Sequence, residues 1–287
     1  MDSRVEGKTA FVFAGGGSFG AIQVGMLHAL LAQGVRPDLV VGASVGAINC
    51  AYFAGNPTPE GVGLLEQLWC GMKRSTVFPM TLSRIAGVFS RSPSLVDASG
   101  LRALIARQLP YSLLEQAALP LHVVATSQLH GNPVCLSSGP AVDAILASCA
   151  IPAIFPPVLV GGDYLIDGAI ASNTPVTTAV GLGATRLIVL PTGFACALTA
   201  PPASAIASAL HALNMLIAHQ LVRDLEGLMD HFEVLTVPPL CPLGASPYDF
   251  SRAAELIERA AENTRRWIEG GGLQRQRIPE ALRPHVD

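Results

Sequence analysis

Three short segments of this chain carry residue types that could together perform acyl transfer. Residues 15–20 (GGGSFG) are rich in glycine, residues 42–46 (GASVG) contain Ser44, and residues 167–169 (DGA) begin with Asp167. Backbone N–H groups of a glycine-rich turn can hold an oxyanion, a serine can attack a carbonyl carbon, and a carboxylate can accept the serine proton. The sequence therefore contains an oxyanion site, a nucleophile and a base.

Ser44 lies between a predicted strand and a predicted helix. Residues 39–41 (LVV) form an apolar run that favours a buried strand, and residues 47–52 continue as a helix. With Gly42 and Gly46 on either side, the segment fits a nucleophile elbow, in which a sharp turn lifts the serine hydroxyl toward a substrate. A plain tight turn accounts for an isolated G-x-S-x-G equally well, so the assignment depends on the other two segments.

The first glycine segment follows a predicted strand, residues 9–14, and precedes a helical pattern that begins near Ile22. Such a turn suits either a nucleotide phosphate or the oxyanion of acyl transfer. Dinucleotide-binding folds place an acidic residue at the end of the second strand. Here that strand ends at Ser44, and Asp38 precedes it. The pattern therefore favours the oxyanion.

Asp167 follows a predicted β-hairpin, with strands at residues 158–160 and 164–166 around a glycine-rich turn. The small residues Gly168 and Ala169 would let its carboxylate approach a neighbouring strand end closely. Taken alone, Asp167 fits a turn cap better than a catalytic base. Its interpretation as a base rests on the absence of any other base placed for Ser44.

Together the three segments resemble the patatin-like phospholipases, serine acyl hydrolases that use a Ser–Asp dyad. The resemblance extends to residues 148–157 (SCAIPAIFPP) and 173–176 (NTPV), and it spans about residues 8 to 195. It implies that Ser44 is the nucleophile and Asp167 the general base, with no metal or cofactor. The oxyanion hole that it implies comprises the amides of Gly15, Gly16 and Gly17. The residues that support these motifs are Ser18, Phe19, Gly20, Gly42, Gly46, Gly168 and Ala169.

Phe19 departs from the family pattern, which usually has Arg or Lys before the last glycine of the loop. An aromatic ring cannot pair with a lipid phosphate, and burying an unpaired phosphate is costly. We therefore expect Phe19 to favour neutral, apolar esters over anionic phospholipids. The main-chain donors of the loop are unaffected by this change.

Two alternatives stay open. An α/β-hydrolase with a Ser-His-Asp triad would have the chain order Ser44, Asp167 and then His211, His219 or His231. Against it, only two strands fit before Ser44, and the first two histidines lie in a helical pattern. The second alternative is a lipid-binding or regulatory protein of the same fold whose catalytic site has decayed.

Composition predicts one large α/β domain. The chain has 287 residues, of which 50% are hydrophobic, and its strand-like and helical segments alternate through residue 195. We expect a three-layer α/β/α fold with a central, mostly parallel sheet. The domain would span residues 1–272, with a helical part at about 203–272, followed by a polar and mobile tail at 273–287. A net charge of −3 argues against nucleic acid as a partner. The expected partner is the lipid or acyl-ester substrate that the resemblance implies.

The six cysteines show no metal-type spacing, and no secretory signal precedes the first predicted strand. We therefore expect buried free thiols in a cytoplasmic protein. The cysteines are Cys50, Cys70, Cys135, Cys149, Cys196 and Cys241.

The stretch from Leu187 to Val222 contains no charged residue. Because prolines at 191, 201 and 202 interrupt it, we expect a strand at 187–190 and then a buried or interfacial helix rather than a membrane span. Peripheral membrane contact stays open. The cation-rich residues 73–107 would suit either a cap that faces anionic lipid or a solvated surface.

Overall fold

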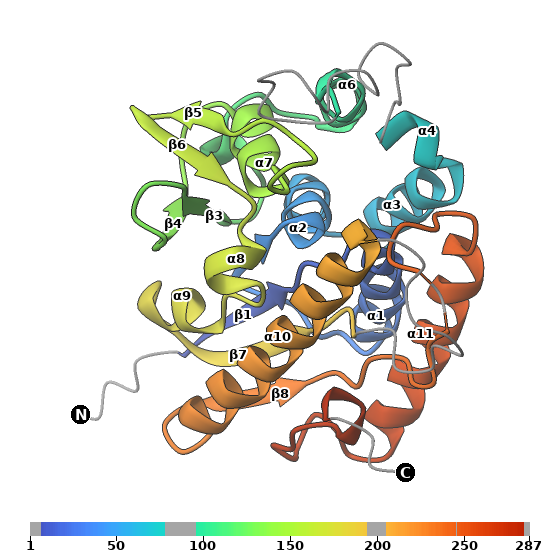
Figure 1. The fold of residues 1–287 in the computed structure, drawn as a ribbon. Helices are drawn as coiled ribbons and strands as arrows, with labels where there is room; N and C mark the ends of the chain where they lie inside the picture. The colour runs from blue at the N-terminus through green and yellow to red at the C-terminus, as the bar shows by residue number, and fades with distance from the viewer. Residues whose placement is uncertain (1–6, 78–95, 194–204, 245, 284–287) are drawn as a thin grey trace.

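A mostly parallel sheet of eight strands forms the centre of the computed structural model (Figure 1). The structure describes residues 7–77, 96–193, 205–244 and 246–283. The strand order is β5-β6-β3-β2-β1-β7-β8, and β4 pairs with β3 outside this path. Strands β3, β2, β1, β7 and β8 run parallel to one another, whereas β4, β5 and β6 pair in antiparallel fashion. The strands are β1 (Lys8–Phe13), β2 (Leu39–Ala43), β3 (Leu121–Ser127), β4 (Pro133–Leu136), β5 (Val158–Val160), β6 (Asp163–Ile166), β7 (Ala184–Leu190) and β8 (Glu233–Thr236).

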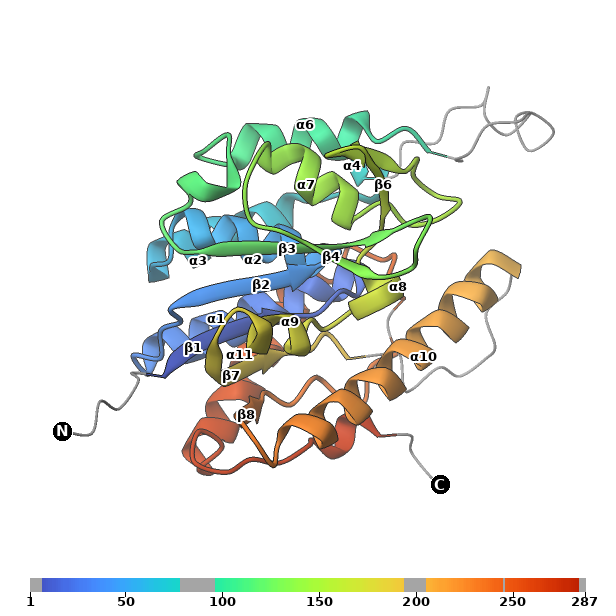
Figure 2. The ribbon, with the colours of Figure 1, turned by 90° about the vertical axis from the view of Figure 1, so that its left-hand side faces the viewer.

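Helices cover both faces of this sheet. The helices are α1 (Gly20–Ala32), α2 (Val45–Gly55), α3 (Pro59–Gly71), α4 (Arg74–Val77), α6 (Ser99–Gln108), α7 (Ala141–Ser148), α8 (Ala169–Ser172), α9 (Val176–Gly181), α10 (Ala205–Leu228) and α11 (Ala253–Glu269). Short 3₁₀ segments are η1 (Gly17–Phe19), η3 (Leu114–Gln116) and η4 (Glu280–Leu282). Figure 2 views the sheet from the side that α9 and α10 cover, with the carboxyl ends of the strands pointing toward α8. The expected three-layer α/β/α fold is confirmed.

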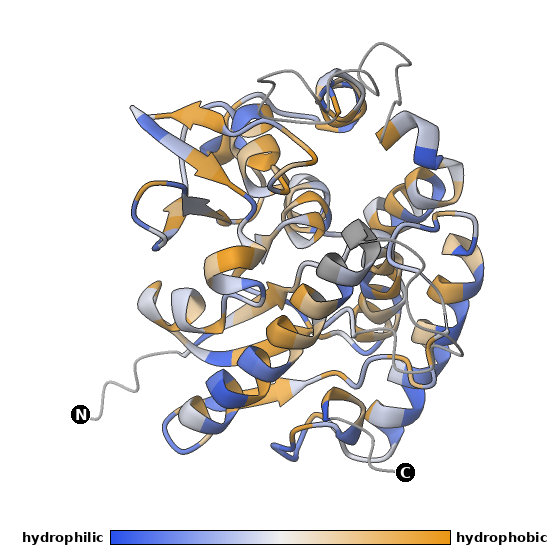
Figure 3. Ribbon diagram, in the orientation of Figure 1, coloured by the Kyte–Doolittle hydropathy of each residue, from blue (hydrophilic) through white to orange (hydrophobic). Residues whose placement is uncertain are grey.

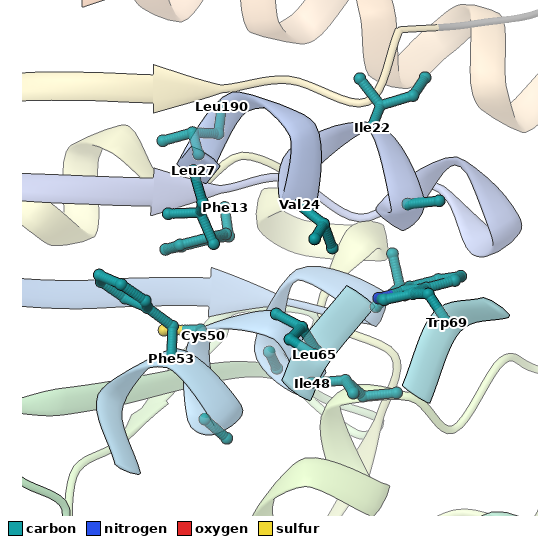
Figure 4. Packing of buried hydrophobic residues seen from close by; sticks show 14 of the residues in the cluster. Phe13, Ile22, Val24, Leu27, Ile48, Cys50, Phe53, Leu65, Trp69 and Leu190 are labelled. Atoms are coloured by element: carbon teal, nitrogen blue, oxygen red, sulfur yellow. The ribbon is translucent and has the colours of Figure 1, made fainter. Parts of the chain in front are cut away.

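Strand β1 shows how the two faces acquire separate cores. Its side chains alternate between the faces, as strand geometry requires. Phe11 and Phe13 belong to the cluster that includes α1, α2 and α11, whereas Ala10 and Val12 belong to the cluster beneath α9 and α10. The ring of Phe53 from α2 lies 6.1 Å from that of Phe11, centroid to centroid. Figure 4 shows part of this first cluster, and Figure 3 shows the apolar residues concentrated in the strands and inner helix faces.

The C-terminal residues are part of the same body. Strand β8 pairs with β7, and α11 packs along α1. The expectation of a separate polar tail from residue 273 is wrong for the described part, since Ile278 and Leu282 are buried in the second cluster. The Gln276 side chain also accepts a hydrogen bond of 2.7 Å from the Val234 N–H. Apolar residues spaced four apart in a polar segment thus anchor it to the sheet.

Other expectations are met in part. Residues 205–228 form one helix, and no helix among the described residues is long and apolar enough to cross a membrane. The expectation of buried cysteines holds for two, Cys50 and Cys149, whereas Cys70, Cys135 and Cys241 are exposed. Cys196 lies outside the described residues, as do Arg84 and Arg91 of the cation-rich segment.

Candidate active site

Ser44 occupies a strained turn between β2 and α2. Its backbone angles are φ 54° and ψ −129°, a conformation that non-glycine residues rarely adopt and that costs about 1–3 kcal/mol. A side chain at Gly42 would collide with the carbonyl of Gly46, and one at Gly46 would collide with the carbonyl of Phe13. Both flanking glycines are therefore required for the close packing of this turn. The backbone has the geometry that the sequence predicts for a nucleophile elbow.

The side chains of Ser44 and Asp167 meet directly. Ser44 Oγ donates a hydrogen bond of 2.8 Å to Asp167 Oδ2, although the two residues are 123 positions apart. The other carboxylate oxygen, Oδ1, accepts a bond of 2.8 Å from the Ala169 N–H. Asp167 is only 2% exposed and Ser44 9% exposed. The carboxylate is therefore held in place and largely shielded from water.

Main-chain contacts explain how Asp167 reaches Ser44. Strand β6 pairs with only the last residues of β3, and the chain leaving it runs beside β3. The Asp167 N–H donates to the Ala150 carbonyl at 3.0 Å, and its own carbonyl accepts from Thr126 Oγ1 at 2.8 Å. A side chain at Gly168 would collide with the Val124 carbonyl. Gly168 thus permits the close approach that the sequence predicts.

Burial changes the acidity of this carboxyl group. Removal from water raises the pKa of Asp167 to about 6, although hydrogen bonds from Ala169 and Ser44 partly oppose the shift. A base is most effective when its pKa lies near the working pH. Asp167 is therefore a better base near neutral pH than an exposed aspartate.

Ser148 and Cys149, which precede the β5–β6 hairpin, contact the main chain of Ser44. The Ser44 N–H donates to Ser148 Oγ at 2.9 Å, and Ser148 Oγ donates to the Val124 carbonyl at 2.6 Å. The Cys149 thiol lies 3.2 Å from the Ser44 carbonyl. The sequence pattern includes both residues in a family-like segment but does not reveal these contacts.

The glycine loop approaches the dyad, but its three amides are not equivalent. The Gly15 N–H donates to the Asn173 carbonyl at 3.0 Å, so it is already engaged within the protein. The Gly15 carbonyl accepts from Thr192 Oγ1 at 2.6 Å. The expectation that the Gly15 amide belongs to the oxyanion hole therefore does not fit this structure. Gly15 instead fixes the base of the loop.

The next two glycines line the same pocket as Ser44 and Asp167. Within the described part of the chain, neither the Gly16 nor the Gly17 N–H donates a hydrogen bond to the protein. Gly17 has a φ of +60°, which favours glycine. These two amides are the donors available to an oxyanion.

A fully buried polar network fixes the start of α1 behind this loop. Gln23 Nε2 donates to the carbonyls of Ala14 and Leu190, each at 2.8 Å. Asn49 Nδ2 donates to Gln23 Oε1 at 2.7 Å, and Trp69 Nε1 donates to Asn49 Oδ1 at 2.8 Å. Sequence reasoning missed these residues. The available signal is a single amide side chain in each of two largely apolar helices, α1 and α2.

Phe19 does not line the pocket that contains Ser44 and Asp167. Its ring is 2% exposed and belongs to the main hydrophobic cluster. The expectation that the Phe19 ring contacts substrate is therefore wrong. The preference for neutral esters that we inferred from this contact loses its basis. Core packing explains why position 19 is hydrophobic, because the Phe19 ring belongs to the main hydrophobic cluster.

The pocket over the dyad is small and mostly apolar. Its volume is about 60 Å³. This volume suits a reacting carbonyl group and its immediate atoms. A larger groove of about 580 Å³, lined by residues of α2, α3 and α6, includes neither dyad residue. The residues that line the small pocket are Gly16, Gly17, Ser44, Ile151, Pro152, Asp167, Ala169, Ile170, Asn173, Leu213, Ile217, Pro247 and Tyr248.

The histidines of the triad alternative lie elsewhere. His211 and His219 are on α10, and His231 is exposed after that helix ends. None of the three lines the pocket. Among the described residues, no histidine hydrogen bonds to Ser44 or Asp167. The geometry therefore favours the two-residue arrangement.

Comparisons with known proteins agree with the motif pattern. A family model described as "Patatin-like phospholipase" matches residues 11–180. An uncharacterized NTE family protein of Mycobacterium tuberculosis is 29% identical over 177 residues, covering 62% of this chain and 47% of that protein. The patatin-like phospholipase domain-containing protein 7 of Rattus norvegicus is 26% identical over 186 residues, covering 64% of this chain and 13% of that protein.

Among solved structures, VipD from Legionella pneumophila matches with a TM-score of 0.49 and 14% sequence identity. The match covers 92% of this chain and 67% of the VipD chain. The matches to the two sequence relatives show that this chain spans about half the length of the mycobacterial protein and a much smaller share of the rat protein.

Proposed function

Because the chain belongs to the patatin-like phospholipase family, we propose that it hydrolyses carboxylic esters of lipid-like substrates through an acyl-serine intermediate. The observation that carries the proposal is the hydrogen bond of 2.8 Å between Ser44 Oγ and the buried carboxylate of Asp167. A serine hydroxyl is a weak nucleophile until a neighbouring base takes its proton. Asp167 supplies that base without a third residue.

In the first step, Ser44 Oγ forms a bond to the ester carbonyl carbon while its proton passes to Asp167 Oδ2. The carbonyl oxygen becomes an oxyanion, which accepts hydrogen bonds from the Gly16 and Gly17 amides. Each such donor contributes about 3 kcal/mol to transition-state stabilisation in related chemistry. In this scheme the Gly15 amide takes no part.

In the second step, the carbon–oxygen bond to the alcohol breaks, and protonated Asp167 returns its proton to the leaving oxygen. Water then attacks the acyl-serine while Asp167 accepts a proton from it. When this second oxyanion collapses, the bond to Ser44 Oγ breaks and protonated Asp167 gives its proton to Oγ, which releases the carboxylic acid and restores both residues. No metal or cofactor enters these steps, because every proton and charge is handled by a named group.

Both alternatives are less well supported. A triad requires an imidazole beside Asp167, and the pocket lining contains none among the described residues. A decayed lipid-binding protein would not need the strained Ser44 backbone or its pairing with a base, whereas both are present. Strain of this kind is typical of functional sites.

A substrate screen tests the proposed activity. We expect the purified chain to hydrolyse p-nitrophenyl esters of graded chain length, monitored by nitrophenolate release. Phospholipids of matched chains, monitored by fatty-acid release, then define the headgroup preference. A folded protein that hydrolyses none of these esters would contradict the proposal and favour the decayed binding protein.

We also propose that α10 makes peripheral contact with lipid surfaces, where such substrates would reside. Leu213 and Ile217 of this helix line the catalytic pocket. Met215 and Leu216, on the same turns, are 44% and 67% exposed. Figure 3 shows that the middle of α10 is apolar and its C-terminal end hydrophilic. Apolar side chains exposed next to a pocket are a typical interfacial surface.

Replacing Leu216 by aspartate is expected to weaken binding to phospholipid vesicles about tenfold, because one buried leucine contributes about 1.5 kcal/mol. Hydrolysis of a soluble, short-chain ester should be unchanged. Vesicle sedimentation measures the binding. The matched control is Leu64→Asp, which changes a leucine of α3 that is 61% exposed. Equal effects of the two substitutions would rule out a specific role for α10.

A further inference from the structure

The loop Ser246–Tyr248 lies against the glycine loop from outside the region that the family model matches. The Ser18 N–H donates to the Pro247 carbonyl at 2.7 Å, and Ser18 Oγ donates to the Ser246 carbonyl at 3.2 Å. A side chain at Gly17 would collide with the same Pro247 carbonyl. This loop, 228 residues away from Ser18 in sequence, is therefore fixed beside the two candidate oxyanion donors.

Tyr248 brings a polar side chain from this loop to the pocket. Four residues with polar side chains line the pocket, namely Ser44, Asp167, Asn173 and Tyr248. The first two bond to each other, and the Asn173 side chain donates to the Gly15 carbonyl at 3.4 Å. Tyr248 adds a phenol to this lining, from a loop outside the region that the family model matches.

The electrostatics of Tyr248 indicate which side of the pocket it faces. Burial and then the charge of Asp167 raise the pKa of Tyr248 to about 12. The phenol therefore stays protonated near neutral pH and can donate a hydrogen bond. Both side chains line the same small pocket, and the charge of Asp167 acts on this phenol, so the ring lies near Asp167. The alcohol oxygen leaves near Asp167 too, because Asp167 returns the proton to it.

We propose that Tyr248 is a specificity-determining residue that contacts the leaving group, its hydroxyl donating a hydrogen bond to the alcohol oxygen as the ester bond breaks. The inference rests on the proposed ester hydrolysis. In this step the bond from the acyl carbon to the alcohol oxygen breaks, and its electron pair goes to that oxygen. The proton comes from Asp167, and Tyr248 keeps its own proton throughout.

The test compares two esters with the same short acyl chain and different alcohols. p-Nitrophenolate leaves readily without assistance, whereas ethoxide is a poor leaving group that needs a donor. Tyr248→Phe should therefore lower kcat/KM for the ethyl ester about tenfold more than for the p-nitrophenyl ester. The melting temperature should stay unchanged, because the ring is retained. The matched control is Tyr164→Phe, which alters a tyrosine of β6 that is 49% exposed and does not line the pocket.

The change in the ratio separates this role from a structural one. Damage to packing would lower both rates equally, so an unchanged ratio in Tyr248→Phe would overturn the leaving-group contact. The same ratio change in Tyr164→Phe would also overturn it. If the wild-type protein hydrolyses neither ester, the proposed function itself fails. Wild-type activity combined with an unchanged ratio refutes only the role of Tyr248.

Discussion

Replacing Ser44 by alanine is expected to abolish ester hydrolysis and leave the fold intact. The substitution removes the attacking oxygen, and loss of a serine nucleophile costs a factor of about 10⁶ in kcat in well-studied hydrolases. Alanine has the same backbone preference as serine, so the strained turn should persist between Gly42 and Gly46. The rate of nitrophenolate release measures the activity, and thermal unfolding measures the stability.

An exposed serine provides the control for this substitution. Ser138→Ala, at an exposed position after β4, should retain wild-type activity. If Ser44→Ala keeps more than a hundredth of the wild-type rate, Ser44 is not the nucleophile. In that case the strain at this turn would require another explanation.

Asp167→Asn should lower kcat/KM by about three orders of magnitude, the middle of the range of about 10²–10⁴ for loss of a general base. The amide has the shape of the carboxylate but cannot accept the Ser44 proton.

The Asp167→Asn substitution should not destabilise the protein at neutral pH. Burial raises the pKa of Asp167 to about 6 in the folded state, so the charged form is disfavoured there. The folded state therefore loses stability as pH rises from about 4 to 6, and the neutral amide avoids this loss.

The pH dependence of kcat/KM gives an independent check on Asp167. Below its pKa of about 6 the carboxyl group is protonated and cannot act as a base. We therefore expect kcat/KM to fall about tenfold per pH unit below pH 6 and to be level above it. In Asp167→Asn the residual rate should lack this acid limb. The measurement is a pH–rate profile with a substrate that does not itself titrate.

The histidines provide the contrast that separates a dyad from a triad. Single substitutions of His211, His219 and His231 by glutamine should each leave kcat/KM within about tenfold of wild type, a change of about 1.4 kcal/mol. A histidine variant as inactive as Asp167→Asn would support the triad instead.

The parts of the site that could be predicted from sequence are those set by short-range geometry. Gly42 and Gly46 specify the Ser44 turn locally, because each faces backbone atoms at a distance that admits no side chain. The pairing of Ser44 with Asp167 depends on how the sheet brings together two residues that are 123 positions apart. No local pattern encodes that contact, so the residues alone offered Asp167 only as a candidate base, and the resemblance to a known family specified the pairing.

The errors have the same physical origin. Phe19 is in a loop motif, yet its ring turns into the core, and only the packing of α1 reveals this direction. The Gly15 amide is engaged by Asn173, whose position depends on the chain that follows Asp167. Tyr248 enters the pocket from a segment without any motif. Such contacts are properties of the assembled sheet and loops.

Covalent labelling by a fluorophosphonate tests the central claim most directly, since only an activated serine reacts with it. The account predicts one adduct per chain, located by peptide mass spectrometry on the peptide that contains Ser44. Labelling should disappear in Ser44→Ala and become much slower in Asp167→Asn, while the three histidine variants react like the wild type. An adduct on another residue, or no adduct on the folded wild-type protein, would contradict the proposed dyad.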